Sequence, residues 1–433
     1  MAKDDGAVNF GPITECPTQR DEKTGVYYDF NNGLRVVTPD TDVIWHLKVW
    51  NYQTGDLLAD KTMPAKSLWS FPKKYFVPYH FSISDNKGNS FEHTMNLRGK
   101  KVAIKMPLRT LGDPIAYFSY FPEFQQLHQC NLEVHTRPHI IDMFEGLYEN
   151  ITLKNIDDAT VDDVYASYYM GLFFNAEYAT SHQPYDFRTY GLHQQSAHIL
   201  GLSDIGYPTP PKINKGISTI SGKYVVISYS GSKQCKMWNN PAGWLGVVRH
   251  LREIGYDVYC IDKDPVIGLG NTWNYAPIGA IDLTGNIPIR DRAAVISGAD
   301  MFIGMASGLS WVAWACNVPV IMISGFSLPF AEFPCFRVIN PYCECIGCWN
   351  DTRINFNHHE FMWCPRIDAK IDLKQEAMRK TTDEEEIKLL KEQIAELEDE
   401  KFICTKSITA SHVNAYIDKV ASMIAKKKEG KNQ

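Results

Sequence analysis

The stretch Met301–Ile323, MFIGMASGLSWVAWACNVPVIMI, decides how the rest of the chain is interpreted. It predicts a buried strand, a loop ending in Ser307-Gly308-Leu309-Ser310, a helix that opens at the glycine, and a second buried strand. A helix N-terminus offers unpaired N–H groups and a partial positive charge, and glycine lets the backbone approach a ligand closely. The pattern therefore favours a bound diphosphate, although an ordinary βαβ crossover without a ligand has the same local sequence.

The residues before this stretch continue the α/β pattern. The sequence predicts strands and helices in alternation: strands over Tyr224–Ser228, Asp257–Ile261 and Gly279–Leu283, and helices from Pro241 to about Ile254 and from Ile289 to Gly298. In such a Rossmann-like lobe, Ser232, Lys236 and the amides at Gly308 and Leu309 would face the diphosphate. The run Asp262-Lys263-Asp264 resembles a metal-binding carboxylate pair, but a solvated loop is the favoured interpretation because Lys236 and the helix dipole are available.

A second α/β pattern begins at Lys100. Lys101–Met106 predicts a strand, Asp113–His128 a helix and Leu132–Val134 the next strand. Asp113 lies at the start of this helix and is followed by Pro114, which suits the first helical position. Asp113 is therefore either a helix N-cap or a site residue at the carboxyl end of a strand. The run Tyr207–Lys212, rich in proline, predicts a hinge. Two lobes with a cleft between them would let Asp113 face the reacting carbon.

The N-terminal region, from about Gly25 to Arg98, alternates apolar and polar residues between Gly/Asn turns. Period-2 segments such as Val26–Phe30, Val43–Val49 and Tyr79–Ile83 predict antiparallel strands, hence a small all-β sandwich or barrel. This region contains no catalytic constellation. Assembly or substrate docking is one interpretation, and a purely structural appendage is the other.

Composition limits the class of protein. A chain of 433 residues accommodates two or three domains, and its 44% hydrophobic and 22% charged residues are ordinary globular values. A formal net charge of −6 argues against a nucleic-acid-binding protein. The first residues, MAKDDGAVNFG, lack the apolar core of a secretion signal, and no apolar run is long enough to span a membrane. A cytosolic protein is therefore expected.

The cysteines form a pattern of their own. Of eleven, several are scattered, but the last quarter contains Cys345-x₂-Cys348, followed by Cys364 and Cys404. A C-x₂-C pair with two further cysteines is typical of structural zinc and of single-iron sites, because a tight knuckle sets two sulfurs on one ion. Competing ligands are Cys343, His358 and His359, and reduced buried thiols without a metal are the alternative.

A charged insertion separates Cys364 from Cys404. Thr382–Glu385 has the pattern of a capping box, and an apolar stripe at helical spacing predicts a projecting helix or helical hairpin, formed by Ile387, Leu390, Ile394 and Leu397. Ser411–Ala425 predicts a last amphipathic helix with Val413, Ile417, Val420 and Ile424 on one face. The Lys426–Lys428 tail is expected to be solvated.

Taken together, four motifs resemble those of bacterial heptosyltransferases of GT-B fold: Leu111-Gly112-Asp113, Ser232-x₃-Lys236-x-Trp238, Asp282-Leu283-Thr284-Gly285 and Ser307-Gly308-Leu309-Ser310-Trp311. The additional β region and the four cysteines narrow the resemblance to the autotransporter heptosyltransferases of the TibC and Aah type. It covers nearly the whole chain except the insertion, about Ile371–Glu400.

This resemblance implies an inverting GT-B enzyme that moves heptose from ADP-glycero-manno-heptose to serines of an autotransporter passenger domain in the cytoplasm. It also implies a dodecamer and a structural ferric ion held by Cys345, Cys348, Cys364 and Cys404, with zinc as the runner-up. Asp113 corresponds to the family's catalytic residue. The implied substrate-binding residues are Thr110, Leu111, Gly112, Ser230, Ser232, Lys236, Asp282, Met305, Ser307, Gly308, Leu309 and Ser310.

The corresponding domain division is an N-terminal β domain (1–98), an acceptor-side lobe (99–211), a nucleotide-sugar lobe (212–342), a four-cysteine metal finger with the insertion at about 371–400 (343–407), and a C-terminal helix with a basic tail (408–433). Two alternatives stay open. One is a lipopolysaccharide-core heptosyltransferase with a lipid-linked acceptor, which would have neither the β domain nor the cysteines. The other is a non-enzymatic metal-binding assembly protein, against which Asp113 and Lys236 argue.

Overall fold

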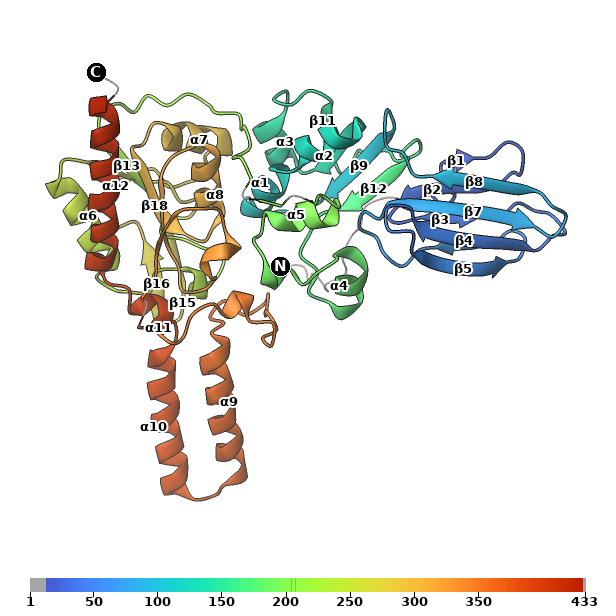
Figure 1. Cartoon of the computed structure of the whole chain (residues 1–433). Helices are drawn as coiled ribbons and strands as arrows, with labels where there is room; N and C mark the ends of the chain where they lie inside the picture. The colour runs from blue at the N-terminus through green and yellow to red at the C-terminus, as the bar shows by residue number, and fades with distance from the viewer. Residues whose placement is uncertain (1–12, 204, 207, 341, 431–433) are drawn as a thin grey trace. The chain divides into compact units, whose positions relative to one another are not determined.

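The computed structural model describes residues 13–430 apart from 204, 207 and 341. The first twelve residues, which include the stretch MAKDDGAVNFG, and Tyr207 of the expected hinge therefore lie outside the described part. Two compact units make up the chain, one ending at Asn214 and the other beginning at Lys215 (Figure 1). This division falls just after the expected hinge. None of the helices described is long and apolar enough to cross a bilayer.

The first unit is built on an eight-stranded mixed sheet. Its strand order is β11 (Ile151–Asn155), β10 (Asn131–Thr136), β9 (Lys101–Met106), β12 (Ala166–Tyr169), β2 (Tyr27–Asn31), β3 (Arg35–Val37) and β6 (Leu68–Ser70), with β1 (Gln19–Arg20) beside β2. The strands from β11 to β12 are parallel, as the βαβ pattern predicts. β2 joins them in parallel, whereas β3 and β6 continue antiparallel.

The N-terminal strands are thus shared between two sheets and do not close into a separate barrel. A second, four-stranded antiparallel sheet has the order β5 (Leu57–Met63), β4 (Trp45–Asn51), β7 (Tyr79–Asp85) and β8 (Ser90–Thr94). It packs on the first sheet through aromatic rings, with the Tyr28 and Phe81 centroids 5.5 Å apart. The sandwich-like packing agrees with the prediction. The prediction of a separate β domain does not agree with the structure, because the N-terminal strands continue into the sheet of the α/β region. The Phe30 amide, for example, donates to the Tyr165 carbonyl at 2.9 Å.

Helices flank the parallel strands of this unit. They are α1 (Gly112–Phe118), α2 (Phe121–His128), α3 (Pro138–Phe144), α4 (Ala176–His182), the short 3₁₀ helix η1 (Phe187–Thr189) and α5 (Gln194–Ile199). The single helix expected over Asp113–His128 is in fact α1 and α2. Pro122, in the first turn of α2, has no N–H for a carbonyl one turn earlier, so a continuous helix is interrupted there.

The second unit contains a six-stranded parallel sheet. Its order is β17 (Ile281–Asp282), β14 (Asp257–Cys260), β13 (Tyr224–Ile227), β18 (Met301–Met305), β19 (Val320–Ile323) and β20 (Phe336–Val338). The helices are η2 (Gln234–Lys236), α6 (Gly243–Glu253), α7 (Ile289–Ser297), α8 (Gly308–Ala315) and α12 (Ala410–Gly430). Val413, Ile417 and Val420 of α12 are buried as predicted. An unexpected hairpin, β15 (Val266–Leu269) with β16 (Thr272–Tyr275), follows β14.

The C-terminal part of this unit carries a helical hairpin. After η3 (Pro329–Ala331) and η4 (Cys348–Asn350), helices α9 (Pro365–Lys380) and α10 (Glu384–Glu400) run side by side, and α11 (Ile403–Lys406) follows (Figure 1). The predicted capping box is displaced by one residue, since Asp383 is the N-cap and accepts from the Glu385 amide. The expected solvated tail is exposed, but Lys428 also pairs with Asp300 at 2.9 Å.

Candidate functional site

Asp113 lies at the carboxyl edge of the first unit's parallel strands. β9 and β10 end together at Met106 and Thr136, and the loop after β9 leads directly into α1. Asp113 is in the first turn of α1, while Leu111 occupies the N-cap position without a side-chain hydrogen bond. The N-cap interpretation of Asp113 is therefore wrong. A carboxylate in the first turn is favoured by the helix dipole, and here it is half-buried at a strand end.

Two hydroxyl groups lie around the Asp113 carboxylate. Thr110 Oγ1 donates to Asp113 Oδ2 at 2.5 Å. One turn later on α1, the Tyr117 side chain is fully buried, and its hydroxyl has no hydrogen-bond partner among the described residues. Burial raises the pKa of Tyr117 well above its usual value, and the nearby Asp113 charge adds to the effect. Tyr117 therefore stays neutral beside this carboxylate.

The corresponding edge of the second unit is shaped by Asp262. This residue is 1% exposed, and its carboxylate accepts from the Ser228 hydroxyl at 2.8 Å and from the Tyr229 amide at 2.9 Å. It also accepts from the Ser230 hydroxyl at 2.5 Å and from the Ser230 amide at 3.2 Å. The prediction of a solvated loop is thus wrong for Asp262, which is buried and anchors the loop after β13. It is correct for Lys263 and Asp264, which are exposed.

The N-terminus of α8 lies at the same carboxyl edge, after Met305. Ser307 is extended, and the half-buried Gly308 and Leu309 form the first turn of the helix. Their amides are the first N–H groups of a helix and suit an anion. Ser310 differs from its predicted role in one respect. Its hydroxyl is fully buried and donates to the Met305 carbonyl at 2.5 Å, so it stabilises the turn.

Lys236 ends η2 in the loop after β13. Its ammonium lies 5.2 Å from the centre of the Phe326 ring and 6.0 Å from that of Trp349, at cation–π distance. Ser232 of the same loop is exposed, as is Asp282 at the end of β17. Most predicted substrate-binding residues thus gather at one edge of the second unit's sheet. The carboxyl edge of the first unit's sheet carries the others, which are Thr110, Leu111, Gly112 and Asp113.

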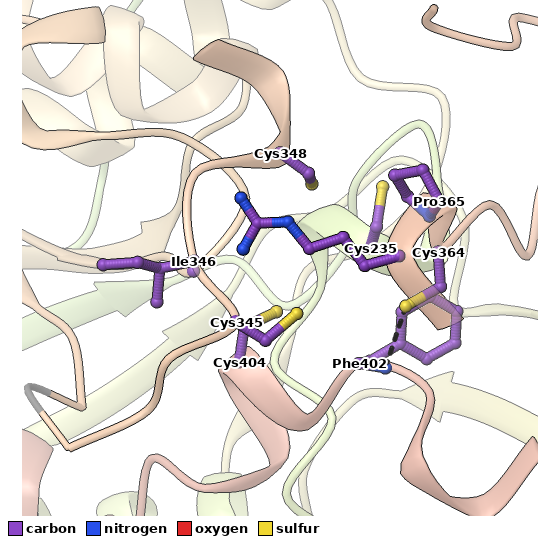
Figure 2. A pocket seen from close by; sticks show the side chains of 10 residues that line it. Cys235, Cys345, Ile346, Cys348, Cys364, Pro365, Phe402 and Cys404 are labelled. Carbon is purple, nitrogen blue, oxygen red and sulfur yellow. Dashed lines mark hydrogen bonds between the residues drawn. The ribbon is translucent and has the colours of Figure 1, made fainter. Parts of the chain in front are cut away.

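The four predicted metal ligands surround one cavity. It measures about 20 Å³, which is room for one ion or water molecule. Figure 2 shows the sulfur atoms of five cysteines around it, because Cys235 joins the predicted set. The lining residues are Cys235, Gly325, Cys345, Ile346, Cys348, Cys364, Pro365, Arg366, Phe402 and Cys404. The predicted competitors Cys343, His358 and His359 do not line it.

Local backbone geometry explains how three distant stretches meet here. Gly347, between Cys345 and Cys348, has φ +71°, a left-handed conformation that lets the chain turn sharply between the two thiols. Cys364 is the N-cap of α9, and Cys404 lies in α11. A Cβ on Gly325 would lie 2.6 Å from that of Cys404, so this glycine allows α11 to approach closely.

The donor set suits a soft metal ion. Burial raises the pKa values of Cys348, Cys364 and Cys404, whereas a bound cation would favour the thiolates. Four thiolates are the donor set that structural zinc and single-iron sites use. Within the described part of the chain, no three His, Cys, Asp or Glu side chains are close enough together to coordinate one ion. The role of the four cysteines as ligands therefore stays a prediction.

The sequence prediction missed Cys235 and Gly325, and it placed Asp262 in a solvated loop although this residue is buried. Cys235 was treated as one of several scattered cysteines, although its position directly before Lys236 could have singled it out. The burial of Asp262 had no such signal, since it depends on strands that meet only in the folded sheet.

Comparison with known proteins identifies the family. An autotransporter heptosyltransferase of Citrobacter rodentium, BAHTCr, is 37% identical over 417 residues, which are 95% of this chain and 93% of that protein. The chain belongs to the autotransporter heptosyltransferases. It is therefore a glycosyltransferase, and the resemblance inferred from the motifs is confirmed. Family models agree: the N-terminal domain of the glycosyltransferase TibC matches residues 23–87, and glycosyltransferase family 9 (heptosyltransferase) matches residues 189–334.

Two further relatives of this heptosyltransferase are informative. A crystal structure of dodecameric iron-containing TibC from enterotoxigenic Escherichia coli H10407, in complex with ADP-D-beta-D-heptose, has a TM-score of 0.82 and 34% identity, covering 95% of this chain and 100% of that one. The second, BimC of Burkholderia thailandensis, is described as an inactive autotransporter heptosyltransferase. It is 31% identical over 361 residues, 83% of this chain and 84% of BimC.

Proposed function

We propose that this heptosyltransferase transfers heptose from ADP-glycero-manno-heptose to serine hydroxyls of an autotransporter passenger domain. The observation that carries the proposal is the similarity along nearly the whole chain to TibC, whose structure contains ADP-heptose. The family motifs at the two sheet edges support it. We assign the pair of α/β units to the GT-B class.

In the proposed donor site, charge on the diphosphate is met by the second unit. The amides of Gly308 and Leu309 and the partial positive end of α8 suit the phosphate oxygens. Lys236 supplies a full positive charge, and its position over Phe326 and Trp349 limits the conformations of its stem. As the sugar–phosphate bond breaks, negative charge grows on the leaving ADP, and these groups stabilise it without moving.

In the proposed acceptor step, Asp113 is the general base. The serine oxygen forms a bond to the anomeric carbon while the bond from that carbon to the phosphate oxygen breaks, and the electron pair leaves with ADP. The serine proton passes to the Asp113 carboxylate, and the sugar configuration inverts. Thr110, which already donates to Asp113, orients this carboxylate.

The proposed cofactor is one ferric ion per chain, held by Cys345, Cys348, Cys364 and Cys404, with zinc as the second candidate. When bound, such an ion would supply cross-links between three distant stretches of chain. Support comes from the shared cavity and from the iron-containing TibC. All eleven cysteines lie in the described residues and are free, which suits a reducing compartment, so we place the reaction in the cytoplasm.

Assembly into a homo-oligomer, by analogy with the TibC dodecamer, completes the proposal. A lipid-linked acceptor is disfavoured because the TibC-type N-terminal region and the cysteines are present. The inactivity ascribed to BimC keeps a non-enzymatic role as the rival outcome.

Intact-mass spectrometry tests this function. A passenger-domain fragment is co-expressed with the wild-type chain, and the matched control is Asp113→Asn. A ladder of heptose-sized increments with the wild type alone supports the proposal. A hexose-sized ladder would contradict the donor, and an unmodified fragment beside a chain that binds ADP would favour the non-enzymatic role.

A further inference from the structure

The segment 233–240, which carries Lys236, forms hydrogen bonds at both of its ends with the four-cysteine finger and the residue that follows it (343–408). Upstream, the Lys233 ammonium donates to the carbonyls of Glu360 at 2.5 Å and His358 at 3.1 Å. The amide of Gln234 donates to the Phe361 carbonyl at 3.1 Å. These carbonyls lie just before Cys364. Because Lys233 is 5% exposed, its bonds are shielded from competing water.

Downstream of Lys236, the attachment is to the stretch around Cys404. The side-chain Nδ2 of Asn239 donates to Thr405 Oγ1 at 2.9 Å, and the side-chain Nδ2 of Asn240 donates to the Lys406 carbonyl at 2.9 Å. The indole of Trp238 donates to the Ile408 carbonyl at 2.8 Å. The carboxyl half of the loop is therefore held against α11 and the residues that follow it.

Between these attachments, the loop enters the finger's own core. Cys235 is 3% exposed and lines the cysteine cavity, as Figure 2 shows. It packs in one apolar cluster with Phe326, Trp363 and Cys364. Phe326 is also the ring over which Lys236 lies. Lys236, proposed to bind the diphosphate, thus lies over a ring of the same small core that contains the proposed metal ligands Cys348 and Cys364.

We propose that metal loading of the cysteine cavity and binding of a nucleoside diphosphate are thermodynamically coupled through the segment 233–240, with Lys233 as a positioning residue. The inference rests on the proposed function, in which Lys236 contacts the diphosphate. The cavity joins Cys345, Cys348, Cys364 and Cys404, which come from three stretches of chain. A metal ion bound there would cross-link these stretches and would hold the attached segment in place.

Coupling of this kind is reciprocal. If the metal-loaded chain binds ADP more tightly than the metal-depleted chain, then ADP must strengthen metal binding by the same factor. If the metal only added stability to a chain that stays folded without it, ADP would have no effect on metal affinity. Two independent measurements can therefore be compared.

The experiment measures ADP affinity by calorimetry, and metal affinity by competition with a chelator in the presence and absence of ADP. For the full-length, metal-loaded chain, we expect each ligand to strengthen the other by about 10-fold or more. In Lys233→Met, all four predicted ligands remain and the metal content should be unchanged. The factor by which ADP and metal strengthen each other's binding should, however, fall below about 2-fold. Lys233→Arg keeps donors for the two carbonyls and should retain coupling.

Cys130→Ala is the matched control, since Cys130 is also buried but belongs to the first unit. It should leave the coupling at the wild-type value. Equal metal affinity with and without ADP, or equal coupling in the wild type and Lys233→Met, would overturn the inference. Failure of the loaded wild-type chain to bind ADP at all would instead overturn the donor site of the proposed function, and the coupling with it.

Discussion

The two segments proposed to act on the substrates are held in opposite ways. In the second unit, the segment around Lys236 bonds to residues 125 to 170 positions further along the chain. In the first unit, Asp113 is held by Thr110, three residues away, at the start of a helix. The donor side is therefore preorganised by tertiary structure, and the acceptor side by local sequence.

This difference has consequences for mutagenesis. Changes on the acceptor side should alter the rate of transfer with little effect on the fold or on ADP affinity. On the donor side, changes to the small core itself should alter ADP affinity, metal retention and stability together, because Phe326 contacts Lys236 and also packs in the cluster that contains Cys364.

The largest effect is expected from Asp113→Asn, which keeps the shape of the side chain but removes its capacity to accept a proton. Transfer should fall by about 100- to 10,000-fold, the range associated with a lost general base. Glycan occupancy on a purified passenger fragment, followed over time, measures this rate. Affinity for ADP, measured by calorimetry, should stay near the wild-type value, and a parallel loss of both would assign Asp113 an architectural role.

Lys236→Met should come next and should behave differently. Loss of the charge removes stabilisation of the diphosphate in the ground state and of the leaving ADP, so transfer should fall by about 100- to 1,000-fold. Unlike Asp113→Asn, this variant should also bind ADP measurably more weakly. Metal content should be unchanged, because the methionine chain can still pack on Phe326 and Trp349.

Gly347→Ala tests the finger that supports the donor loop. The residue has φ +71°, and a Cβ would lie 2.7 Å from the Leu328 side chain. We expect a loss of roughly 1–3 kcal/mol in the free energy of unfolding, from backbone strain and crowding together. Thermal denaturation and metal analysis measure it. Gly55→Ala, at a positive φ with open space around it, is the control for backbone strain alone.

Local patterns explain what the sequence predicted well. The parallel strands, α6 to α8, α12 and the helical insertion all follow from periodicity and capping signals within about 20 residues. The position of Asp113 at the start of a helix was likewise predictable, because the loop, the aspartate and the helix start are contiguous in Leu111-Gly112-Asp113. The grouping of Cys345, Cys348, Cys364 and Cys404 was accessible because C-x₂-C is a distinctive spacing.

What the sequence did not reveal depends on contacts between distant segments. The parallel pairing of β2 with β12 joins residues about Phe30 and Ala166, and no local pattern records it. The burial of Asp262 and the approach of Cys235 to the cavity have the same origin. Pro122, which divides the helix expected after Asp113, was in contrast a local signal that was overlooked.

Thr110→Val should have the smallest effect, and it tests most directly whether Asp113 is held by local contacts. It removes the hydroxyl that donates to Asp113 while keeping nearly the same volume. A single hydrogen bond contributes about 0.5–1.5 kcal/mol, so transfer should fall by roughly 2- to 12-fold. Thr110→Ser keeps the donor and should restore most of the rate. If Thr110→Val instead weakened ADP binding, the acceptor side would not be as locally determined as its contacts indicate.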